Sequence, residues 1–571
     1  MRKLAVIAGF GGINPAGRSS AHHAFRRIVL DELSADQQQQ TLNSLAQLMN
    51  LPHNGDDGWR QQILNGTLIR GWDNVGWDAN AVPFHQPFTD ESGTPCWRLG
   101  HKRLAVQSAG QIPKGFDPAA QYPSHHHPRG LQLAVYAASD ALGQLGMDWE
   151  RIRNHLRPDQ IAVYAGSAMG QLDGDGHGGM TQSALLGKRT SSKQCALGLS
   201  EMPADFVNAY VLGNIGATGS MVGACATFLY NLKVALDDIQ SGRRRLVMVG
   251  NSESPLTPEI VEGYSAMTAL VTEQKLRELD GLNAGQTPDF RRASRPFGYN
   301  GGFTIAESGQ FFVLCDDELA LELGLTIYGA VGDVYVHADG YKKSISNPGV
   351  GNYLTMGKAM GEARRWLGED ALKNGSFVHA HGSSTPANRT TESHIFSELA
   401  QAFGIKRWPV TAAKAHLGHS IAAASADQLV LTLGTWAHGI IPGITTTSEI
   451  AGDVHQTGLD ILLQHKPVNG ANLPLAFINA KGFGGNNASG FMISPQQVHK
   501  LLAHKAGSQG WKDYLARNEF IRLNAQEYDS RVTRGEHKPR YIFGDGVLEP
   551  GDLSISDSEI RVKGWEESVR L

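Results

Sequence analysis

One cysteine and two histidines in this sequence could together carry out nucleophilic catalysis. Cys225 lies in the run GACAT, whose small residues leave room for a substrate carbonyl to approach the sulfur. His381 follows a short apolar run in FVHAHGSSTP, and His419 ends the run KAHLGH, which also contains Lys414. A thiol nucleophile needs a base and hydrogen-bond donors for the charge that develops on the substrate. The surrounding elements must therefore bring the thiol and the imidazoles together.

The segment around Cys225 predicts a strand end, a sharp turn, a helix and a second strand. Apolar residues recur every three or four positions over Phe228–Ile239, and Gly242 ends this helix before the apolar run Leu246–Gly250. Cys225 then lies at the helix N-terminus, where the helix dipole should stabilise a thiolate relative to the ordinary cysteine pKa of about 8.5. The alternative is a structural cysteine, because free cysteines are among the most buried residues.

The two histidines and Phe483 each follow a predicted strand. A β run ends near His381, a strand-to-helix junction carries Lys414 and His419, and Phe483 lies in a glycine turn between two strands. Any one histidine is more often structural than catalytic. Three such turns, each at the end of a strand, favour a common site.

Composition indicates a large globular protein. The chain has 571 residues, 41% of them hydrophobic, and a net charge of −4. This charge gives no general attraction to nucleic acid or to an anionic membrane, and no apolar run approaches the roughly 18 residues of a spanning helix. The start of the chain is interpreted as a first strand, so we expect a cytoplasmic protein. The four cysteines are expected to be reduced thiols.

Two further motifs are interpreted as structural. The GxGG pattern at Gly9–Gly12 lacks the third glycine and the later acidic residue of a dinucleotide site. The histidines His125–His127 do not share one face of a helix or strand and precede Pro128. We interpret them as a solvated loop rather than a metal site.

Two successive series of strands and helices predict a duplicated α/β architecture with parallel sheets covered by helices. The first series ends with the strand Gln310–Cys315, and the second contains the apolar run Leu325–Asp333 and a helix near Met356–Leu367. The region from about residue 21 to 115, with a polar helix at Asp36–Met49, is interpreted as an insertion that lines an entrance or a dimer surface.

As a set, the motifs resemble those of the β-ketoacyl-ACP synthases, the thiolase-like condensing enzymes. GACAT, HGSSTP, KAHLGH and GFGGNNA occur in that family's order, and SRPF…GGFTIAES resembles its segment before the last strand of the first half. The resemblance implies a layered α/β/α/β/α fold. Its expected parts are a first half at 1–316 that contains the insertion, a second half at 317–496 and a C-terminal extension at 497–571.

The resemblance also implies the roles of the site residues. Cys225 would hold the acyl group, His381 and His419 would promote decarboxylation of a malonyl unit, and the backbone N–H groups of Cys225 and Phe483 would form the oxyanion hole. Lys414 would polarise the site or only hold the His381 loop. Phe483 could also act as a gate. The expected substrate-binding residues are Ser383, Thr385, Phe228, Gly484 and Gly485. The alternative for Phe228 is an ordinary position in the helix core. No metal or organic cofactor is expected, and the implied partners are acyl carrier protein (ACP), malonyl-ACP, an acyl-CoA or acyl-ACP primer and a second copy of the chain.

The sequence departs from the family pattern at three positions. Arg389 stands where an aspartate is usual, Gln428 replaces the glutamate that pairs with the lysine in elongating synthases, and Gly301 replaces an aspartate. The whole pattern is most similar to FabY-type synthases, which the resemblance implies start fatty-acid synthesis from an acetyl primer. The alternative is an elongating or polyketide-type ketosynthase that uses acyl-ACP primers.

Other readings of the same residues are disfavoured. Two histidines, rather than one histidine and a second cysteine, argue against a thiolase, and the intact Cys225 argues against a decarboxylase-only subunit. A cysteine hydrolase would need an asparagine or aspartate that orients one histidine, and no such motif is apparent. A non-catalytic scaffold is disfavoured because all three polar catalytic residues are present. An acidic carrier protein should meet a basic patch, for which Arg243–Arg245 is one candidate and a solvated turn is the alternative.

Overall fold

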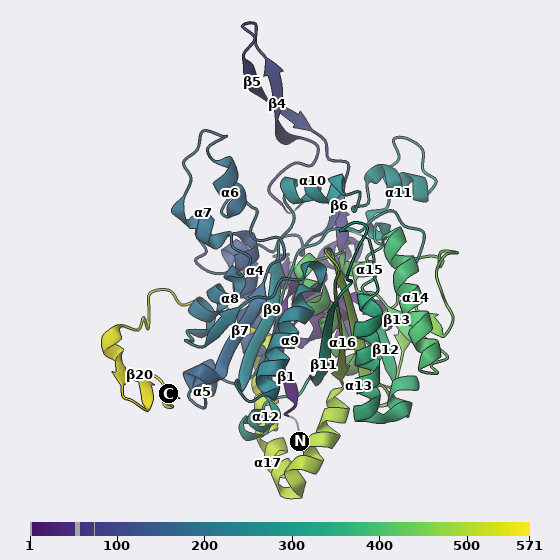
Figure 1. Cartoon of the computed structure of the whole chain (residues 1–571). Coiled ribbons are helices and arrows are strands. Elements are labelled where there is room, and N and C mark those ends of the chain that lie inside the picture. The colour runs from purple at the N-terminus through teal and green to yellow at the C-terminus, as the bar shows by residue number, and fades with distance from the viewer. Residues whose placement is uncertain (1–2, 52–57, 74, 346) are drawn as a thin grey trace.

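The computed structural model describes residues 3–51, 58–73, 75–345 and 347–571 and is built around one large mixed β-sheet (Figure 1). In order across the sheet, its strands are β15 (Leu459–Ile461), β13 (Trp408–Thr411), β12 (Ser376–His379), β17 (Leu475–Gly482), β18 (Asn486–Ile493), β11 (Gly329–Ala338), β1 (Ala5–Asn14), β10 (Ser308–Asp316), β9 (Leu246–Glu253), β7 (Ile161–Gly166) and β8 (Ala217–Gly219). The short β2 (Gly17–Arg18) pairs with β1.

The direction of the strands differs between the ends and the middle of the sheet. β12, β13, β15 and β17 run parallel, as do β7, β8 and β9, whereas every pair from β9 through β10, β1, β11 and β18 to β17 is antiparallel. The prediction of parallel sheets is therefore wrong for the middle. A strand buried on both faces is apolar throughout in either orientation, so its sequence does not reveal its direction.

Helices form layers inside and outside this sheet. α9 (Thr227–Gln240) and α16 (Ala424–His438) pack on each other, and each contacts strands from both halves of the sheet, so they form an inner layer. α4 (Arg129–Gln144) covers β1 and β10 on the outer side, and α13 (Gly351–Lys373) covers β11 and β18. The predicted apolar face of α9 is confirmed, since Phe228, Leu232, Leu236 and Ile239 are fully buried.

Shorter elements complete the body. They are α5 (Trp149–Arg153), α6 (His177–Gln182), α7 (Ser192–Leu197), α8 (Met202–Val207), α10 (Pro258–Ala266), α11 (Glu273–Leu279), α12 (Asp317–Leu323), α14 (Pro386–Ala402), α15 (Lys414–Leu417), β14 (Ile440–Ile441) and β16 (Lys466–Pro467). No helix in the described ranges is both long and apolar enough to cross a membrane.

The region predicted as an insertion forms a helical part and a projecting arm. The helical part consists of α1 (His23–Ile28), α2 (Ala35–Leu48) and α3 (Gly58–Asn65), and α2 begins with the capping box of Ser34 and Gln37. β3 (Ile69–Gly71) pairs with β6 (Ser108–Gly110), and the hairpin of β4 (Val82–Thr89) and β5 (Pro95–Lys102) projects from the body (Figure 1).

The region predicted as a C-terminal extension contains most of a long helix followed by a small sheet. α17 (Pro495–Thr533) runs along α12, β11, α4 and α2, and Gly507, with φ of 70°, interrupts its helical geometry. Beyond it, β19 (Leu553–Ile555), β20 (Glu559–Val562) and β21 (Val569–Arg570) form a three-stranded sheet at the side of the molecule (Figure 1).

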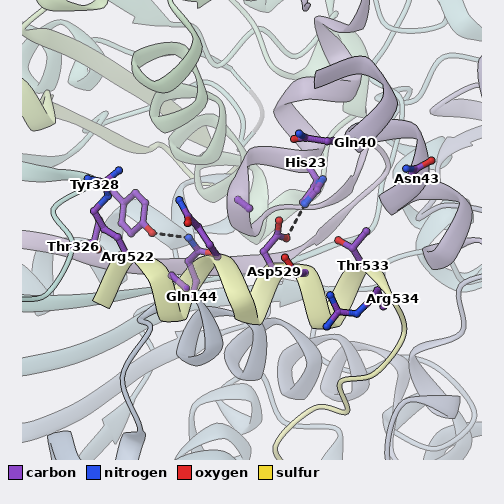
Figure 2. A pocket seen from close by; sticks show the side chains of 14 residues that line it. His23, Gln40, Asn43, Gln144, Thr326, Tyr328, Arg522, Asp529, Thr533 and Arg534 are labelled. Atoms are coloured by element: carbon purple, nitrogen blue, oxygen red, sulfur yellow. Dashed lines mark hydrogen bonds and ion pairs between the residues drawn. The ribbon is translucent and has the colours of Figure 1, made fainter. Parts of the chain in front are cut away.

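A buried ion pair joins the end of α17 to the segment that follows β1. Asp529 pairs with Arg18, whose side chain is 2% exposed. It also accepts a hydrogen bond from Nε2 of His23 at 2.8 Å (Figure 2). A polar cavity of about 700 Å³ lies beside this contact, between α17 and α2. Buried guanidinium groups need such partners, because an unpaired buried charge is strongly unfavourable.

We predict that Asp529→Asn lowers the free energy of unfolding by about 3–5 kcal/mol at neutral pH, because it leaves Arg18 without its main counter-charge. Arg18 and His23 hold the pKa of Asp529 below its usual range, so the stabilisation is present at neutral pH and should fade as the pH falls below about 4. Urea denaturation across pH measures this. Glu536→Gln, which removes an exposed partner of Arg534, is the control and should change nothing measurable; equal stability of the two variants would contradict the prediction.

Candidate active site

Cys225 lies in the tight turn that leads into α9. This 3-10 turn spans Ala224–Ala226, and Cys225 is 3% exposed. Ala224 has a left-handed backbone, with φ of 50°, which side-chain-bearing residues rarely adopt. A Cβ on Gly482 of β17 would come 2.3 Å from the carbonyl oxygen of Gly223 and 3.2 Å from the nitrogen of Cys225, so only glycine fits there. The strained turn thus packs directly against the end of β17.

Burial controls the protonation of the Cys225 thiol. It raises the pKa of the thiol to about 12, although the charge of Lys414 and hydrogen bonds from the backbone N–H groups of Cys225 and Phe483 act in the other direction. The prediction of a stabilised thiolate is therefore wrong, because the loss of solvation outweighs the helix dipole. The two N–H groups that converge on the sulfur are those from which the sequence predicts an oxyanion hole.

His381 follows β12 and is held from behind by a buried carboxylate. Glu392 of α14 accepts hydrogen bonds from the backbone N–H groups of His381, at 2.6 Å, and Gly382, at 2.8 Å. The backbone N–H of Lys481 donates to Nδ1 of the His381 ring at 3.4 Å, which places the ring proton on Nε2. Burial, and then the charge of Lys414, hold the pKa of His381 well below 6.5. The ring therefore offers a neutral Nε2–H donor.

His419 is fixed in the same tautomer by a different segment. The backbone N–H of Ile421 donates to Nδ1 of His419 at 3.2 Å, and the backbone N–H of His419 donates to the carbonyl oxygen of Thr304 at 2.7 Å. Burial, and then the charge of Lys414, also lower the pKa of His419 well below 6.5. Its ring centroid lies 5.4 Å from that of His381, with the planes at 84°. Two neutral imidazoles thus lie side by side, each with its proton on Nε2.

Lys414 is bound to the His381 segment. Its Nζ donates to the carbonyl oxygen of His381 at 2.6 Å and lies 3.4 Å from Nδ1 of the same residue. Burial lowers the pKa of Lys414 to about 8. Gln428 donates from Nε2 to the carbonyl oxygens of Ala380, at 2.6 Å, and Asn479, at 3.3 Å, which a glutamate could not do. The amide therefore ties the end of β12 to β17. The contacts of Lys414 favour the alternative in which this lysine holds the His381 loop.

Three of the four predicted catalytic side chains line one pocket of about 420 Å³, whereas Lys414 is not among its lining residues and reaches it only through its bonds to His381. Its lining includes Cys225, His381, His419, Phe483, Ser383 and Thr385. Oγ of Ser383 lies 3.1 Å from Oγ1 of Thr385, and Thr385 also accepts the backbone N–H of Asn388 at 3.3 Å as the N-cap of α14. Both hydroxyls therefore have ordinary turn roles and also face the pocket.

Three predicted substrate-binding residues lie elsewhere. Phe228 is fully buried, and its ring packs 5.4 Å from that of Phe312, so it is a core residue and does not line the pocket. Gly484 and Gly485, with φ of 89° and 90°, form the turn after Phe483 and are not among the residues that line the pocket. Their left-handed backbones need glycine, which accounts for the motif structurally.

The candidate basic patch is neutralised and remote. Arg243 pairs with Asp238 at 2.8 Å, and Arg245 pairs with Asp316 at 2.9 Å. These arginines follow the C-terminal end of α9, whereas Cys225 precedes its N-terminal end, so roughly 20 Å of helix separates them. The alternative of a solvated turn therefore fits better.

Arg389, one of the departures from the family pattern, has a partner of its own. It makes bonds of 2.8 and 2.9 Å to Asp453.

The three adjacent histidines differ in their exposure. His125 and His126 are exposed, as expected of a solvated loop, but His127 is half-buried, with Nδ1 3.1 Å from the hydroxyl of Tyr122. Among the residues that the structure describes, no three His, Cys, Asp or Glu side chains are grouped to hold a metal ion.

Sequence reasoning missed two polar residues at the site. Lys481 lines the pocket, and burial lowers its pKa. Glu253 is buried at the end of β9 and its charge is felt by Cys225. A carboxylate that ends an apolar strand run, as in LVMVGNSE, is the signal that could have revealed Glu253, because such strand ends commonly form sites. No comparable signal marks Lys481.

Family comparisons cover much of the chain. Residues 100–320 match the N-terminal domain of β-ketoacyl synthases, and residues 328–447 match the C-terminal domain. The chain is 46% identical to the β-ketoacyl-[acyl-carrier-protein] synthase FabY of Pseudomonas aeruginosa, over 100% of this chain and 98% of that protein. It is 27% identical to 3-oxoacyl-[acyl-carrier-protein] synthase 2 of Vibrio cholerae, over 68% of this chain and 88% of that protein.

Solved structures give the same relationship. The crystal structure of the noncanonical ketosynthase FabY from P. aeruginosa superposes with a TM-score of 0.97 at 45% identity and covers 100% of this chain and 98% of that one. A β-ketoacyl synthase from Burkholderia phymatum gives a TM-score of 0.61 at 20% identity, over 86% of this chain and 99% of that one, and supports the fold alone.

We predict that alkylation of Cys225 by iodoacetamide accelerates with every step from pH 7 to pH 9.5, because the raised thiol pKa keeps the thiolate a minor species throughout. Below its pKa a thiol gains about tenfold in thiolate per pH unit. Peptide mass mapping measures the rate at this residue, and Cys225→Ser is the control. A rate that levels off below pH 8 would show that the thiolate is stabilised after all.

Proposed function

The chain belongs to the β-ketoacyl synthase family, and we propose that it starts fatty-acid synthesis by condensing an acetyl primer with malonyl-ACP. The observation that carries this proposal is the pocket in which Cys225 faces two neutral imidazoles, His381 and His419. ACP as the carrier is supported by the similarity to FabY, a β-ketoacyl-[acyl-carrier-protein] synthase. The thiol and the two Nε2–H donors match the two substrates of a decarboxylative condensation.

The first step loads the primer. Sγ of Cys225 attacks the thioester carbonyl of the primer, the new C–S bond forms as the carrier's C–S bond breaks, and the carrier thiol leaves with the proton. The backbone N–H groups of Cys225 and Phe483 receive the oxyanion, a contribution of roughly 3–4 kcal/mol for each donor. Because the free thiol resists ionisation, its proton must be lost as the new bond forms.

The second step makes and uses the carbanion. The C–C bond to the malonyl carboxylate breaks, CO2 leaves, and the electron pair remains as an enolate whose oxygen accepts the Nε2–H groups of His381 and His419. Neutral donors suit this task, since they need not lose or gain a proton. The carbanion then attacks the Cys225 thioester, the C–S bond breaks, and the released thiolate takes a proton from solvent.

Packing around the nucleophile supports a short primer. Buried apolar side chains share the cluster around Cys225, namely Leu256, Ile260, Val261, Tyr264, Phe303 and Ile421. The pocket of about 420 Å³ must also admit the carrier's arm. An elongating or polyketide-type synthase, the second candidate, would need a longer channel at this point.

A homodimer is proposed from the edge of the sheet. β8 ends the sheet order, and its outer side has no strand partner among the described residues. Ile215, Met221 and Val222 beside it are 47%, 50% and 49% exposed, so a second copy could bury an apolar border there. Sedimentation velocity at micromolar concentration should give the mass of two chains, and Val222→Asp should reduce it to one.

We predict that the two half-reactions separate by mutation. Cys225→Gln should lose condensation and still release CO2 from malonyl-ACP, because the imidazoles remain, whereas His381→Ala and His419→Ala should each lose about a hundredfold or more of that release. Labelled CO2 is measured directly, and acylation of Cys225 in the histidine variants is the control. Equal decarboxylation by all three variants would refute the assigned roles.

We predict a preference for short primers. Condensation rates with malonyl-ACP and primers from two to twelve carbons should fall sharply after the shortest, because buried apolar side chains crowd Cys225. Each methylene accepted in an apolar pocket changes the rate by roughly tenfold or somewhat more. Phe228→Ala is the matched control and should leave the profile unchanged, since Phe228 lies in the core. Long acyl-ACP primers that match the acetyl primer would favour the elongating alternative.

A further inference from the structure

Glu253 is a buried carboxylate that the reaction outlined above does not use. It lies at the C-terminal end of β9 and is 1% exposed. Its Oε1 accepts hydrogen bonds from Oγ of Ser167, at 2.5 Å, and the N–H of Met169, at 3.4 Å. Its Oε2 accepts the N–H of Ala168, at 2.8 Å, and that of Ala422, at 3.3 Å. Hydrogen bonds from two separate segments thus satisfy this charge.

One of these segments carries the support of His419. Ala422 lies in the 3-10 turn Ile421–Ala423 that precedes α16. Ile421, the residue before it, has φ of 46°, a left-handed conformation that is a clear outlier for a β-branched residue. The N–H of Ile421 is the group that donates to Nδ1 of His419. Such strain persists only where neighbouring contacts hold it.

Two side-chain acceptors hold this strained turn. Nδ1 of His419 binds the N–H of Ile421, and the Glu253 carboxylate binds the next N–H, that of Ala422. Without the carboxylate, the turn would relax toward an ordinary backbone and Ile421 would no longer point at the imidazole. Nδ1 would then be free to take the proton, and Nε2 would no longer be a donor.

We infer that Glu253 is a positioning residue, whose carboxylate holds the turn Ile421–Ala423 in the conformation that keeps His419 in its Nε2–H tautomer. This inference rests on the proposed use of His419 in decarboxylation. Its chemistry is that of an orienting carboxylate acting through the backbone. Glu253 makes no bond to substrate in this role.

The role requires an ionised carboxylate, because a protonated carboxyl group would present a proton to backbone donors. Burial raises the pKa of Glu253 to about 7, against the hydrogen bonds that lower it. The titratable groups that face it are Cys225 and Tyr264, whose pKa values burial raises. Decarboxylation should therefore weaken as the pH falls from 8 to 6, while Lys414, with its pKa lowered to about 8, governs the alkaline side.

The experiment compares Glu253→Gln with Glu273→Gln, a similarly buried carboxylate that pairs with Arg103 and Arg277 away from the pocket. Imidazole ¹⁵N spectra of histidine-labelled protein report the His419 tautomer, assigned with His419→Ala. Release of CO2 from malonyl-ACP reports function. We expect Glu253→Gln to move His419 away from the Nε2–H form and to slow CO2 release about tenfold to a hundredfold. The fall in CO2 release on the acid side of its pH profile, here called the acid limb, should be absent in this variant. Glu273→Gln should match the unmodified enzyme.

Two further variants keep the test decisive if Glu253→Gln folds poorly. Ser167→Ala removes one donor to the charged carboxylate, so its pKa should rise and the acid limb should move toward higher pH by about half to one unit. Ile421→Gly relieves the left-handed strain, so Glu253→Gln should slow CO2 release less in that background.

The outcomes separate this inference from the proposed function. An unchanged His419 tautomer in Glu253→Gln, or an unmoved acid limb in Ser167→Ala, overturns the positioning role whatever the activity. A changed tautomer with CO2 release that survives in His419→Ala supports the positioning role and overturns the proposed use of His419 instead.

Discussion

Removal of water from a cluster of polar side chains is the constraint on which this structure depends. Cys225, His381, Lys414 and His419 are each no more than 6% exposed, so each must find its partners inside the protein. Desolvation favours the neutral thiol and the neutral imidazoles, and it weakens the charge of the lysine. In the proposed reaction, developing charge would therefore meet fixed N–H dipoles, without reliance on charged side chains that water would screen.

Backbone strain is the second feature of this arrangement. Residues with left-handed backbones flank each reactive group: Ala224 precedes the thiol, Ser384 follows His381, and Ile421 follows His419. Each strained residue is tied by a specific contact, such as the hydrogen bond from the N–H of Arg295 to Oγ of Ser384 at 2.7 Å. The strain is therefore supported by the surrounding fold, which keeps the donors and the nucleophile in place before substrate arrives.

The departures from the family pattern show how one buried site can be held by different partners. Gln428 joins two strands through carbonyl oxygens, and Lys414 binds the carbonyl oxygen of His381. Arg389 finds Asp453, a residue 64 positions away. The C-terminal helix adds a further tie, since Asp529 neutralises Arg18 close to the first strand. Each of these residues therefore has its own partner within this chain.

The sequence by itself determined the local elements and pointed to the groups proposed to react, because both depend on neighbouring residues. The apolar face of α9, the glycine turn around Phe483 and the strand ends before the histidines follow from short-range periodicity and turn chemistry. The family motifs then identified the thiol and the two imidazoles. Tertiary structure decided what depends on segments far apart: the antiparallel middle of the sheet, the core position of Phe228 and the neutralised arginines after α9. It also decided the thiol pKa, because a helix dipole is visible in a local pattern whereas the loss of solvent is set by the whole fold.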